Sequence, residues 1–164
     1  PVDAIVAVLD RDILLASDLE ERAIPYKLQA ADTKPTAAAT RAIYREVLEH
    51  MIDDAILHRL ADDKRITVEA HEIDAGIDSV AQKNKMTKEQ ILDAAKALGM
   101  SERAYRDDVS RQIIEGKLFT LRRAGMTTTL SADEATRQKQ LEVERVAWLK
   151  TLRAGVHIEI RFKP

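Results

Sequence analysis

The stretch Arg65–Arg123 decides the fold; it reads RITVEAHEIDAGIDSVAQKNKMTKEQILDAAKALGMSERAYRDDVSRQIIEGKLFTLRR. It predicts three consecutive helices, because each of its segments opens with a start signal and carries apolar residues at helical spacing. Thr67 precedes the first apolar stripe. Thr87 and Gln90 form a capping box ahead of the second. Gly99 then ends that segment, since glycine takes the left-handed conformation at no steric cost.

The third segment of this stretch is the longest. Ser101 opens it, with Glu102 in its first turn. The middle segment has about three turns at most, so it is not stable alone and must bury its stripe against its neighbours. The three stripes consist of Val68, Ile73, Ile77 and Val80; of Ile91, Leu92, Ala95 and Leu98; and of Tyr105, Val109, Ile113, Leu118 and Leu121.

The residues at the N-terminus predict a strand hairpin followed by a helix. Ala4–Leu9 is a nearly continuous apolar run, typical of a strand buried on both faces, and Ile13–Leu15 follows a polar turn as a returning strand. Ser17 and Glu20 form a capping box, which predicts a helix start. Pro25 is expected to end or kink this helix, because proline removes a hydrogen-bond donor and clashes with the preceding turn.

A longer helix is expected after a loop over Asp32–Thr36. It covers Ala37–Ala61, where apolar residues recur along one face. This buried stripe consists of Ile43, Val47, Met51, Ala55 or Ile56, and Leu60.

The C-terminal part predicts one more helix and a strand. Ser131 and Glu134 form a capping box, and a glycine ends the helix at position 155. Its apolar side carries Leu141, Trp148, Leu149 and Leu152. Val156–Phe162 alternates apolar and polar residues, as a half-buried strand does. We expect this strand to pair with Ala4–Leu9, which needs neighbours on both edges. The expected fold class is mainly α: a helical module with a small antiparallel sheet formed by the N-terminal hairpin and the C-terminal strand.

Composition limits the classes of function. The 164 residues are 45% apolar and 33% charged, which is typical of one soluble helical domain. The net charge of −2 gives no basic excess, so we expect neither nucleic acid nor an anionic membrane as a partner. No stretch is apolar enough to span a bilayer. The absence of cysteine excludes disulfides and thiol catalysis.

No residue pattern predicts catalysis or a cofactor. His50 and Asp54 are spaced to face one metal ion, but no third ligand has motif spacing, so a solvated helix face is the favoured interpretation. His71 and His157 are isolated. No nucleophile elbow, phosphate-binding loop or dinucleotide-binding motif is present. We therefore expect a protein that is not an enzyme and has no metal and no cofactor.

An ordered set of short motifs in residues 66–118 resembles the N-terminal helical module of the SurA-type periplasmic chaperones. A hydroxyl-x-E start leads to an A-x-x-N-x-M-[ST] junction, a short helix that ends at a glycine, and a Y-R-x-x-[IV]-R helix. The residues that carry this resemblance are Thr67, Ala81, Asn84, Met86, Thr87, Gln90, Ile91, Gly99, Tyr105, Arg106, Val109 and Arg111. The resemblance implies a helical module whose N- and C-terminal strands meet.

The sequence departs from this family at one place. The family usually inserts one or two parvulin-type prolyl isomerase modules, of about 100 residues each, where residues 124–130 form a short connector here. We therefore expect one SurA-like chaperone domain over residues 1–164, without isomerase activity. It would divide into a strand hairpin (1–16), a helical module (17–123), the connector (124–130), and the C-terminal helix and strand (131–164).

The function implied by the resemblance is that of an ATP-independent periplasmic chaperone, with its signal peptide removed. It would bind unfolded outer-membrane or secreted proteins in an apolar groove between the central helices and the strand-bearing core. The candidate client-binding residues are Met86, Ile91, Leu92, Leu98, Met100 and Tyr105. The alternative is a non-enzymatic assembly partner of one specific envelope protein. If the connector does not reverse direction, the C-terminal helix would dock on a second copy in a swapped homodimer.

Overall fold

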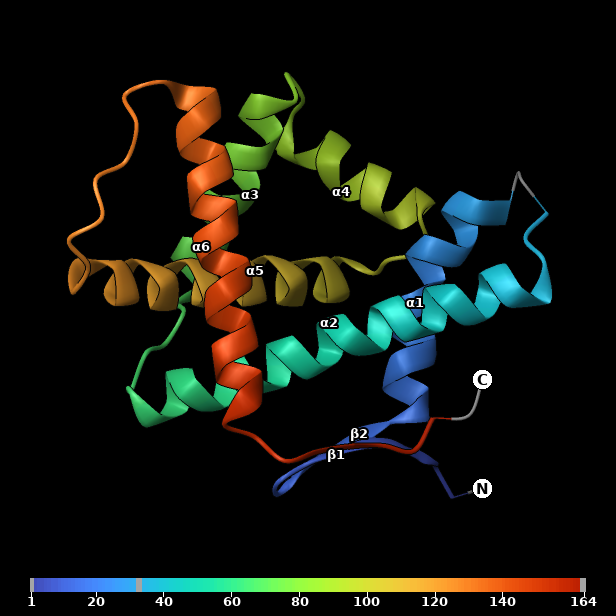
Figure 1. The fold of residues 1–164 in the computed structure, drawn as a ribbon. Helices are drawn as coiled ribbons and strands as arrows, with labels where there is room; N and C mark the ends of the chain where they lie inside the picture. The colour runs from blue at the N-terminus through green and yellow to red at the C-terminus, as the bar shows by residue number, and fades with distance from the viewer. Residues whose placement is uncertain (1, 32–33, 163–164) are drawn as a thin grey trace.

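The two ends of the chain meet in a small antiparallel sheet (Figure 1). A computed structural model describes residues 2–31 and 34–162. Within these ranges the strands are β1 (Ile5–Leu9), β2 (Asp12–Leu15) and β3 (Ile158–Ile160), in the order β2-β1-β3. β1 pairs with β3 through Ala7 and Ile160, Val8 and Glu159, and Leu9 and Ile158. The predicted pairing of the terminal strands is therefore confirmed, although β3 is shorter than the alternating run in the sequence.

Helices form most of the rest of the described chain, and the mainly α fold class is confirmed. Two of them follow the hairpin directly, three make a module of their own, and the last returns the chain to the sheet. Their bounds are α1 (Ala16–Ala31), α2 (Ala37–Asp63), α3 (Ala70–Lys83), α4 (Lys88–Ala97), α5 (Glu102–Ala124) and α6 (Glu134–Ala154). None of these helices is both long and apolar enough to cross a membrane, as far as the described residues go.

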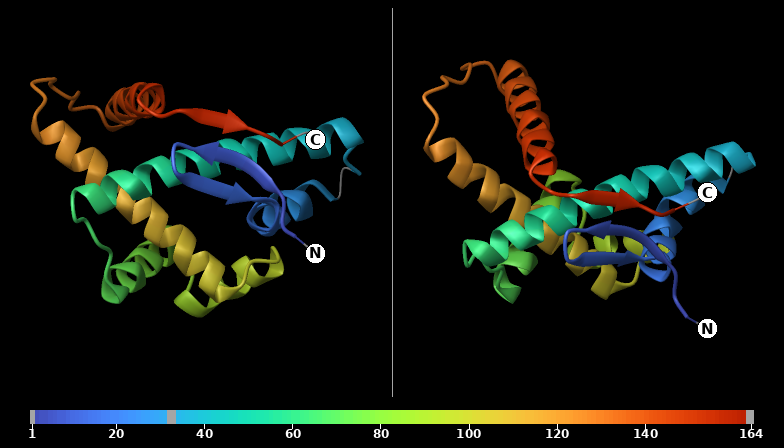
Figure 2. Two further views of the ribbon diagram at one scale, coloured as in Figure 1. Left: turned by 90° about the horizontal axis from the view of Figure 1, so that it is seen from below. Right: turned by 60° about the horizontal axis from the view of Figure 1, so that its bottom comes forward.

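The largest core lies between the sheet and helices α1 and α2. β1 contributes an apolar run whose residues Val6, Ala7 and Leu9 are at most 4% exposed. Leu19 of α1 and Ile52 of α2 pack against them. Figure 2 shows α2 running behind the β1–β2 hairpin and β3. The long apolar stripe of α2 is thus buried against the sheet, as its sequence predicts.

Helices α3, α4 and α5 share a second core, and we call them the α3–α5 module. Ile77 is fully buried at its centre, together with Ile91 and Val109. The predicted capping box at the start of α4 is present: Thr87 N donates to Gln90 Oε1 at 2.8 Å, and Gln90 N donates to Thr87 Oγ1 at 3.2 Å. The short middle helix is therefore held by its neighbours, as expected from its length.

Helix α6 closes the structure by packing across α5 and onto α2. Trp148 is 4% exposed and packs with Leu57 of α2 and Leu118 of α5. Its ring centroid lies 5.6 Å from that of Phe119. The segment over residues 125–133, which contains most of the predicted connector, joins α5 to α6, and α6 packs on α2 and α5 of the same chain. The swapped homodimer stays a prediction.

The start and the course of α1 correct two predictions. The helix begins at Ala16, directly after β2, and Ser17 does not cap it. The Ser17 hydroxyl donates instead to the carboxylate of Asp3, and the Glu20 carboxylate accepts from the Tyr44 hydroxyl at 2.7 Å. Pro25 lies inside α1, which continues to Ala31, so termination at the proline is wrong. Burial of one helix face against α2 offsets the hydrogen bond that proline removes.

Two other helix starts also differ from the sequence prediction. α3 begins after Glu69 rather than Thr67, because Glu69 N donates to the side chain of Glu72 at 2.9 Å in a capping box. α6 begins after Asp133, whose carboxylate accepts from Thr136 N at 2.8 Å. Ser131 lies two residues before Asp133, and its hydroxyl accepts from Asp133 N at 3.2 Å. In both cases an acidic side chain replaces the expected hydroxyl as the cap.

Candidate functional site

The C-terminal end of α4 meets α1 at a place where only glycine fits. Gly99 has a φ of +74°, which is in the left-handed region that other residues rarely adopt. A Cβ atom at this position would lie 2.6 Å from Ile24 Cγ2 and 2.8 Å from Leu28 Cδ1. The backbone after α4 therefore passes in close contact with α1, and this contact positions one helix on the other.

Three apolar side chains at this junction are partly open to solvent. Ile24 and Leu28 lie one turn apart on α1 and are 37% and 45% exposed, and Leu98 beside Gly99 is 37% exposed. We call these three residues the α1–α4 patch. A contiguous group of exposed apolar side chains is a candidate surface for binding another polypeptide. The patch lies between a central helix and the strand-bearing core, where the sequence analysis expects a groove.

Three of the predicted client-binding residues are placed in the core of the α3–α5 module. Met86, Ile91 and Tyr105 pack around Ile77. Ile91 is 8% exposed, and Met86 and Tyr105 are half-buried. In this structure Ile91 fixes the position of α4 and contributes almost no surface.

The other three predicted residues lie nearer the surface. Leu92 and Met100 are half-buried, and Leu98 belongs to the α1–α4 patch. Sequence analysis missed Ile24 and Leu28, because it took Pro25 as an interruption of the helix that carries both. Their spacing of four residues is the signal that would have found them.

Charged groups bind the three helices of the module to one another. Asp74 of α3 accepts from Lys88 Nζ of α4 at 2.9 Å and from Arg106 Nη1 of α5 at 2.8 Å. These two hydrogen bonds hold the pKa of the Asp74 carboxyl below its usual value. The bond from Lys88 has the larger effect, and the bond from Arg106 comes second. The carboxylate is therefore ionised at neutral pH and ties α3 to α4 and α5.

A second carboxylate connects the module to the helices below it. Asp54 of α2 lies 2.5 Å from Arg22 Nη2 of α1 and 3.3 Å from Arg111 Nε of α5. The three side chains are 24% to 31% exposed, so water screens their attraction only in part. This cluster fixes α5 against α1 and α2, next to the α1–α4 patch.

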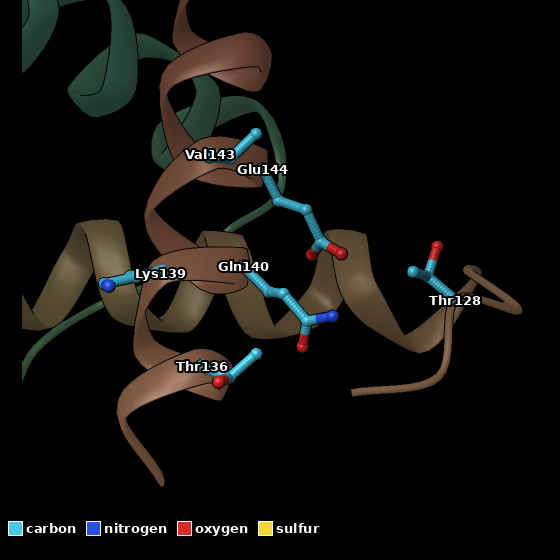
Figure 3. A pocket seen from close by; sticks show the side chains of 6 residues that line it. All are labelled: Thr128, Thr136, Lys139, Gln140, Val143 and Glu144. Carbon is cyan, nitrogen blue, oxygen red and sulfur yellow. The ribbon is translucent and has the colours of Figure 1, made fainter. Parts of the chain in front are cut away.

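A pocket of about 360 Å³ lies between α6 and the connector that precedes it. Figure 3 shows Thr128 on the connector facing the side chains of α6 across this pocket. The lining residues are Thr128, Thr136, Lys139, Gln140, Val143 and Glu144. Glu144 pairs with Arg123, and Gln140 Oε1 accepts from Ser131 N at 2.8 Å. These polar groups are thus bonded within the chain, and the pocket offers methyl groups to a ligand.

The histidines of α2 lie on a solvated face. His50 Nε2 lies 3.9 Å from Glu46 and His58 Nε2 lies 3.8 Å from Asp62, and all four side chains are more than half exposed. Over residues 2–31 and 34–162, no group of three or more His, Asp or Glu side chains is arranged to hold a metal ion.

The chain matches one family model, and it is similar to many individual proteins. The family model described as the SurA N-terminal domain matches residues 2–118. A protein named Chaperone SurA from Cupriavidus metallidurans is 31% identical over 112 residues, which are 68% of this chain and 23% of that protein.

Two further proteins of this name show the same degree of similarity. The one from Chromohalobacter salexigens is 29% identical over 114 residues, 70% of this chain and 26% of its own length. The one from Pseudomonas putida is 27% identical over 114 residues, 70% of this chain and 27% of its own length. The chain thus spans about a quarter of the length of these relatives.

Proposed function

Because the chain belongs to the SurA N-terminal domain family, we propose that it is an ATP-independent chaperone for unfolded outer-membrane or secreted proteins in the periplasm. Its relatives carry the name chaperone, which supports a binding function rather than catalysis. A protein that binds unfolded chains lowers their free concentration by mass action and so slows their aggregation. No nucleotide is needed for this mechanism.

The observation that carries the proposal is the α1–α4 patch. Ile24, Leu28 and Leu98 expose apolar surface beside a glycine contact that keeps α1 and α4 at a fixed separation. An apolar side chain of a client would remove this surface from water, at about 25 cal/mol per Å². The client must also become ordered, which costs free energy, so the affinity is modest and suits reversible holding.

The half-buried and buried candidates support this surface in two ways. Leu92 and Met100 keep part of their apolar surface in solvent, and the flexible side chain of Met100 can adapt to clients of different shape. Met86, Ile91 and Tyr105 lie in the core of the α3–α5 module. They hold α4 in the position from which it presents Leu98.

Isomerase activity is not part of the proposed function. The connector joins α5 to α6 directly and holds no inserted module, whereas a catalytic domain needs about 100 residues. A prolyl isomerisation assay on a short peptide is expected to give the uncatalysed rate. A rate enhancement that follows the concentration of the protein would contradict this part of the proposal.

The chaperone proposal is tested by light scattering of a denatured outer-membrane β-barrel protein during dilution. The parent chain is expected to suppress aggregation, and a double variant with Leu28→Gln and Leu98→Gln is expected to need at least about threefold more protein for the same suppression. Leu121→Gln is the matched control, because Leu121 is 54% exposed on α5 and lies outside the patch. Equal suppression by the parent and the double variant would refute the patch, and selective capture of one folded protein without suppression would refute the general chaperone.

A further inference from the structure

The outward face of α6 carries a short stripe of two valines between two lysines. Lys139, Val143, Val146 and Lys150 follow each other at spacings of four, three and four residues, so they share one face of the helix. This face is opposite Trp148, the residue that packs α6 into the core. Val143 is 70% exposed and Val146 is 53% exposed, and both lysines are exposed. We call these four residues the α6 stripe.

The two lysines differ from the other basic residues of α6. Arg145 pairs with Glu115 and Glu142, Arg153 pairs with Glu49 and Asp53, and Arg137 pairs with Glu134. Among the described residues, neither Lys139 nor Lys150 has an ion-pair partner. The charges that hold α6 to the body are thus satisfied within the chain, while those that flank the valines are free for a partner.

We propose that the α6 stripe binds an acidic polypeptide segment that forms a helix antiparallel to α6. The complementary segment carries apolar side chains at positions i+4 and i+7 and carboxylates at positions i and i+11. Its apolar pair covers Val143 and Val146, and its carboxylates meet Lys139 and Lys150. The partner is therefore a protein with an acidic amphipathic helix, which is a different ligand class from the unfolded clients of the α1–α4 patch.

Charge selects this occupant over a second copy of the chain. In an antiparallel pair of α6 helices, Val143 of each copy faces Val146 of the other, and the same register places Lys139 opposite Lys150. A parallel pair places each lysine opposite itself. Both arrangements bring like charges together, which disfavours self-association. A partner with carboxylates at the same two positions replaces both repulsions with attractions.

The same residues argue against a lipid surface. Helices that lie in a membrane interface carry large apolar side chains and many basic residues on the polar face. The α6 stripe offers two short valines and two lysines. A polypeptide of opposite charge is the better match.

The pocket beside the stripe gives the partner a second contact. Val143 lines both the α6 stripe and the pocket of about 360 Å³ under the connector. Glu144 and Gln140 at this pocket are engaged by Arg123 and Ser131. An apolar side chain that enters here therefore meets the methyl groups of Thr128, Thr136 and Val143 (Figure 3).

The proposal is tested by NMR titration of the full chain with a designed acidic helical peptide. The peptide carries glutamates at positions i and i+11 and leucines at positions i+4 and i+7, and a second peptide replaces both glutamates with lysine. The acidic peptide is expected to shift the amide resonances of α6 and the connector. The double variant with Lys139→Glu and Lys150→Glu is expected to bind the acidic peptide at least about tenfold more weakly and to bind the lysine peptide instead.

The matched control changes the net charge of the chain by the same amount, at another exposed site. Arg41→Glu combined with Arg45→Glu, on α2, alters two exposed residues that have no ion-pair partner among the described residues. This variant is expected to bind both peptides as the parent does. Equal weakening by both double variants would show a net-charge effect and overturn the proposal, as would no shift of α6 at millimolar acidic peptide.

Two further readouts separate the rejected occupants. If the parent chain sediments with vesicles of anionic lipid and does not bind the acidic peptide, the proposal is overturned in favour of a membrane. A concentration-dependent dimer abolished by Val143→Asp would overturn it in favour of a second copy. The α6 stripe lies on a different helix from the α1–α4 patch, so the outcome of the aggregation assay does not decide this test.

Discussion

Helices α2 and α6 are both long, yet they are held in very different ways. Of the 27 described residues of α2, seven are buried; of the 21 described residues of α6, Trp148 is the one that is buried. α2 packs against the sheet with one part and against α5 and α6 with another. α6 packs with one face alone and leaves the α6 stripe in solvent. α2 therefore lies at the centre of the fold, and α6 packs on its outside.

Charged contacts add to the attachment of α6. Arg153 Nε lies 2.6 Å from Asp53 and Arg153 Nη1 lies 2.5 Å from Glu49, while Arg145 Nη1 lies 2.8 Å from Glu115. Ion pairs that are partly exposed contribute about 0–1 kcal/mol each, whereas burying a large aromatic side chain contributes several times more. The attachment of α6 is therefore concentrated in Trp148, and the ion pairs adjust it.

The largest expected effect is in α2. Ile52 is fully buried between β1 and α1, so Ile52→Ala is expected to lower the free energy of unfolding by about 4 kcal/mol through lost burial and a cavity. Urea unfolding followed by far-UV circular dichroism measures this loss as one shifted transition. Val146→Ala on α6 is the control and is expected to change stability by less than about 0.5 kcal/mol. A similar loss of stability in both variants would show that the two helices do not differ in how much their burial contributes to stability.

The second effect is smaller and local. Trp148→Ala is expected to lower the free energy of unfolding by about 3 kcal/mol. This value is at the lower end for removal of an aromatic side chain, because α6 can detach without unfolding α2. Hydrogen exchange is expected to show lost protection in α6 and retained protection in α2, with faster proteolysis of the connector. Trp148→Phe keeps the ring contact with Phe119 in part and is expected to lie between the parent and the alanine variant. Loss of protection in α2 to the same extent would mean that the two helices unfold as one unit.

Helix starts could be predicted from the sequence where the capping contact is local. Thr87 and Gln90 bond within one turn, and Ser101 Oγ accepts from Ala104 N at 3.1 Å. Ser17 fails as a cap because its hydroxyl bonds to Asp3, 14 residues away in the sequence. A window of neighbouring residues holds no sign of such a partner. The pairing of the terminal strands could be predicted, since few strand candidates compete for β1.

The candidate site was less accessible to sequence analysis, because exposure depends on which helices meet. Ile91 belongs to an amphipathic stripe, and the stripe says which face is apolar without saying whether it is covered. Ile24 and Leu28 were missed because Pro25 was expected to end or kink the helix that carries both, whereas α1 continues past it. Their contact with Gly99 joins α1 to α4, which are far apart in sequence.

The smallest expected effect concerns the charges that adjust the attachment of α6. Arg153→Met keeps the apolar part of the side chain and removes its ion pairs with Glu49 and Asp53. It is expected to lower the protection of α6 by about 1 kcal/mol, because the pairs are partly exposed and screened. Salt weakens such pairs, so hydrogen exchange of α6 in the parent is expected to speed up between low and high salt, while the variant changes little. An effect of Arg153→Met as large as that of Trp148→Ala would mean that charge, rather than the tryptophan, is what fastens α6 to the body.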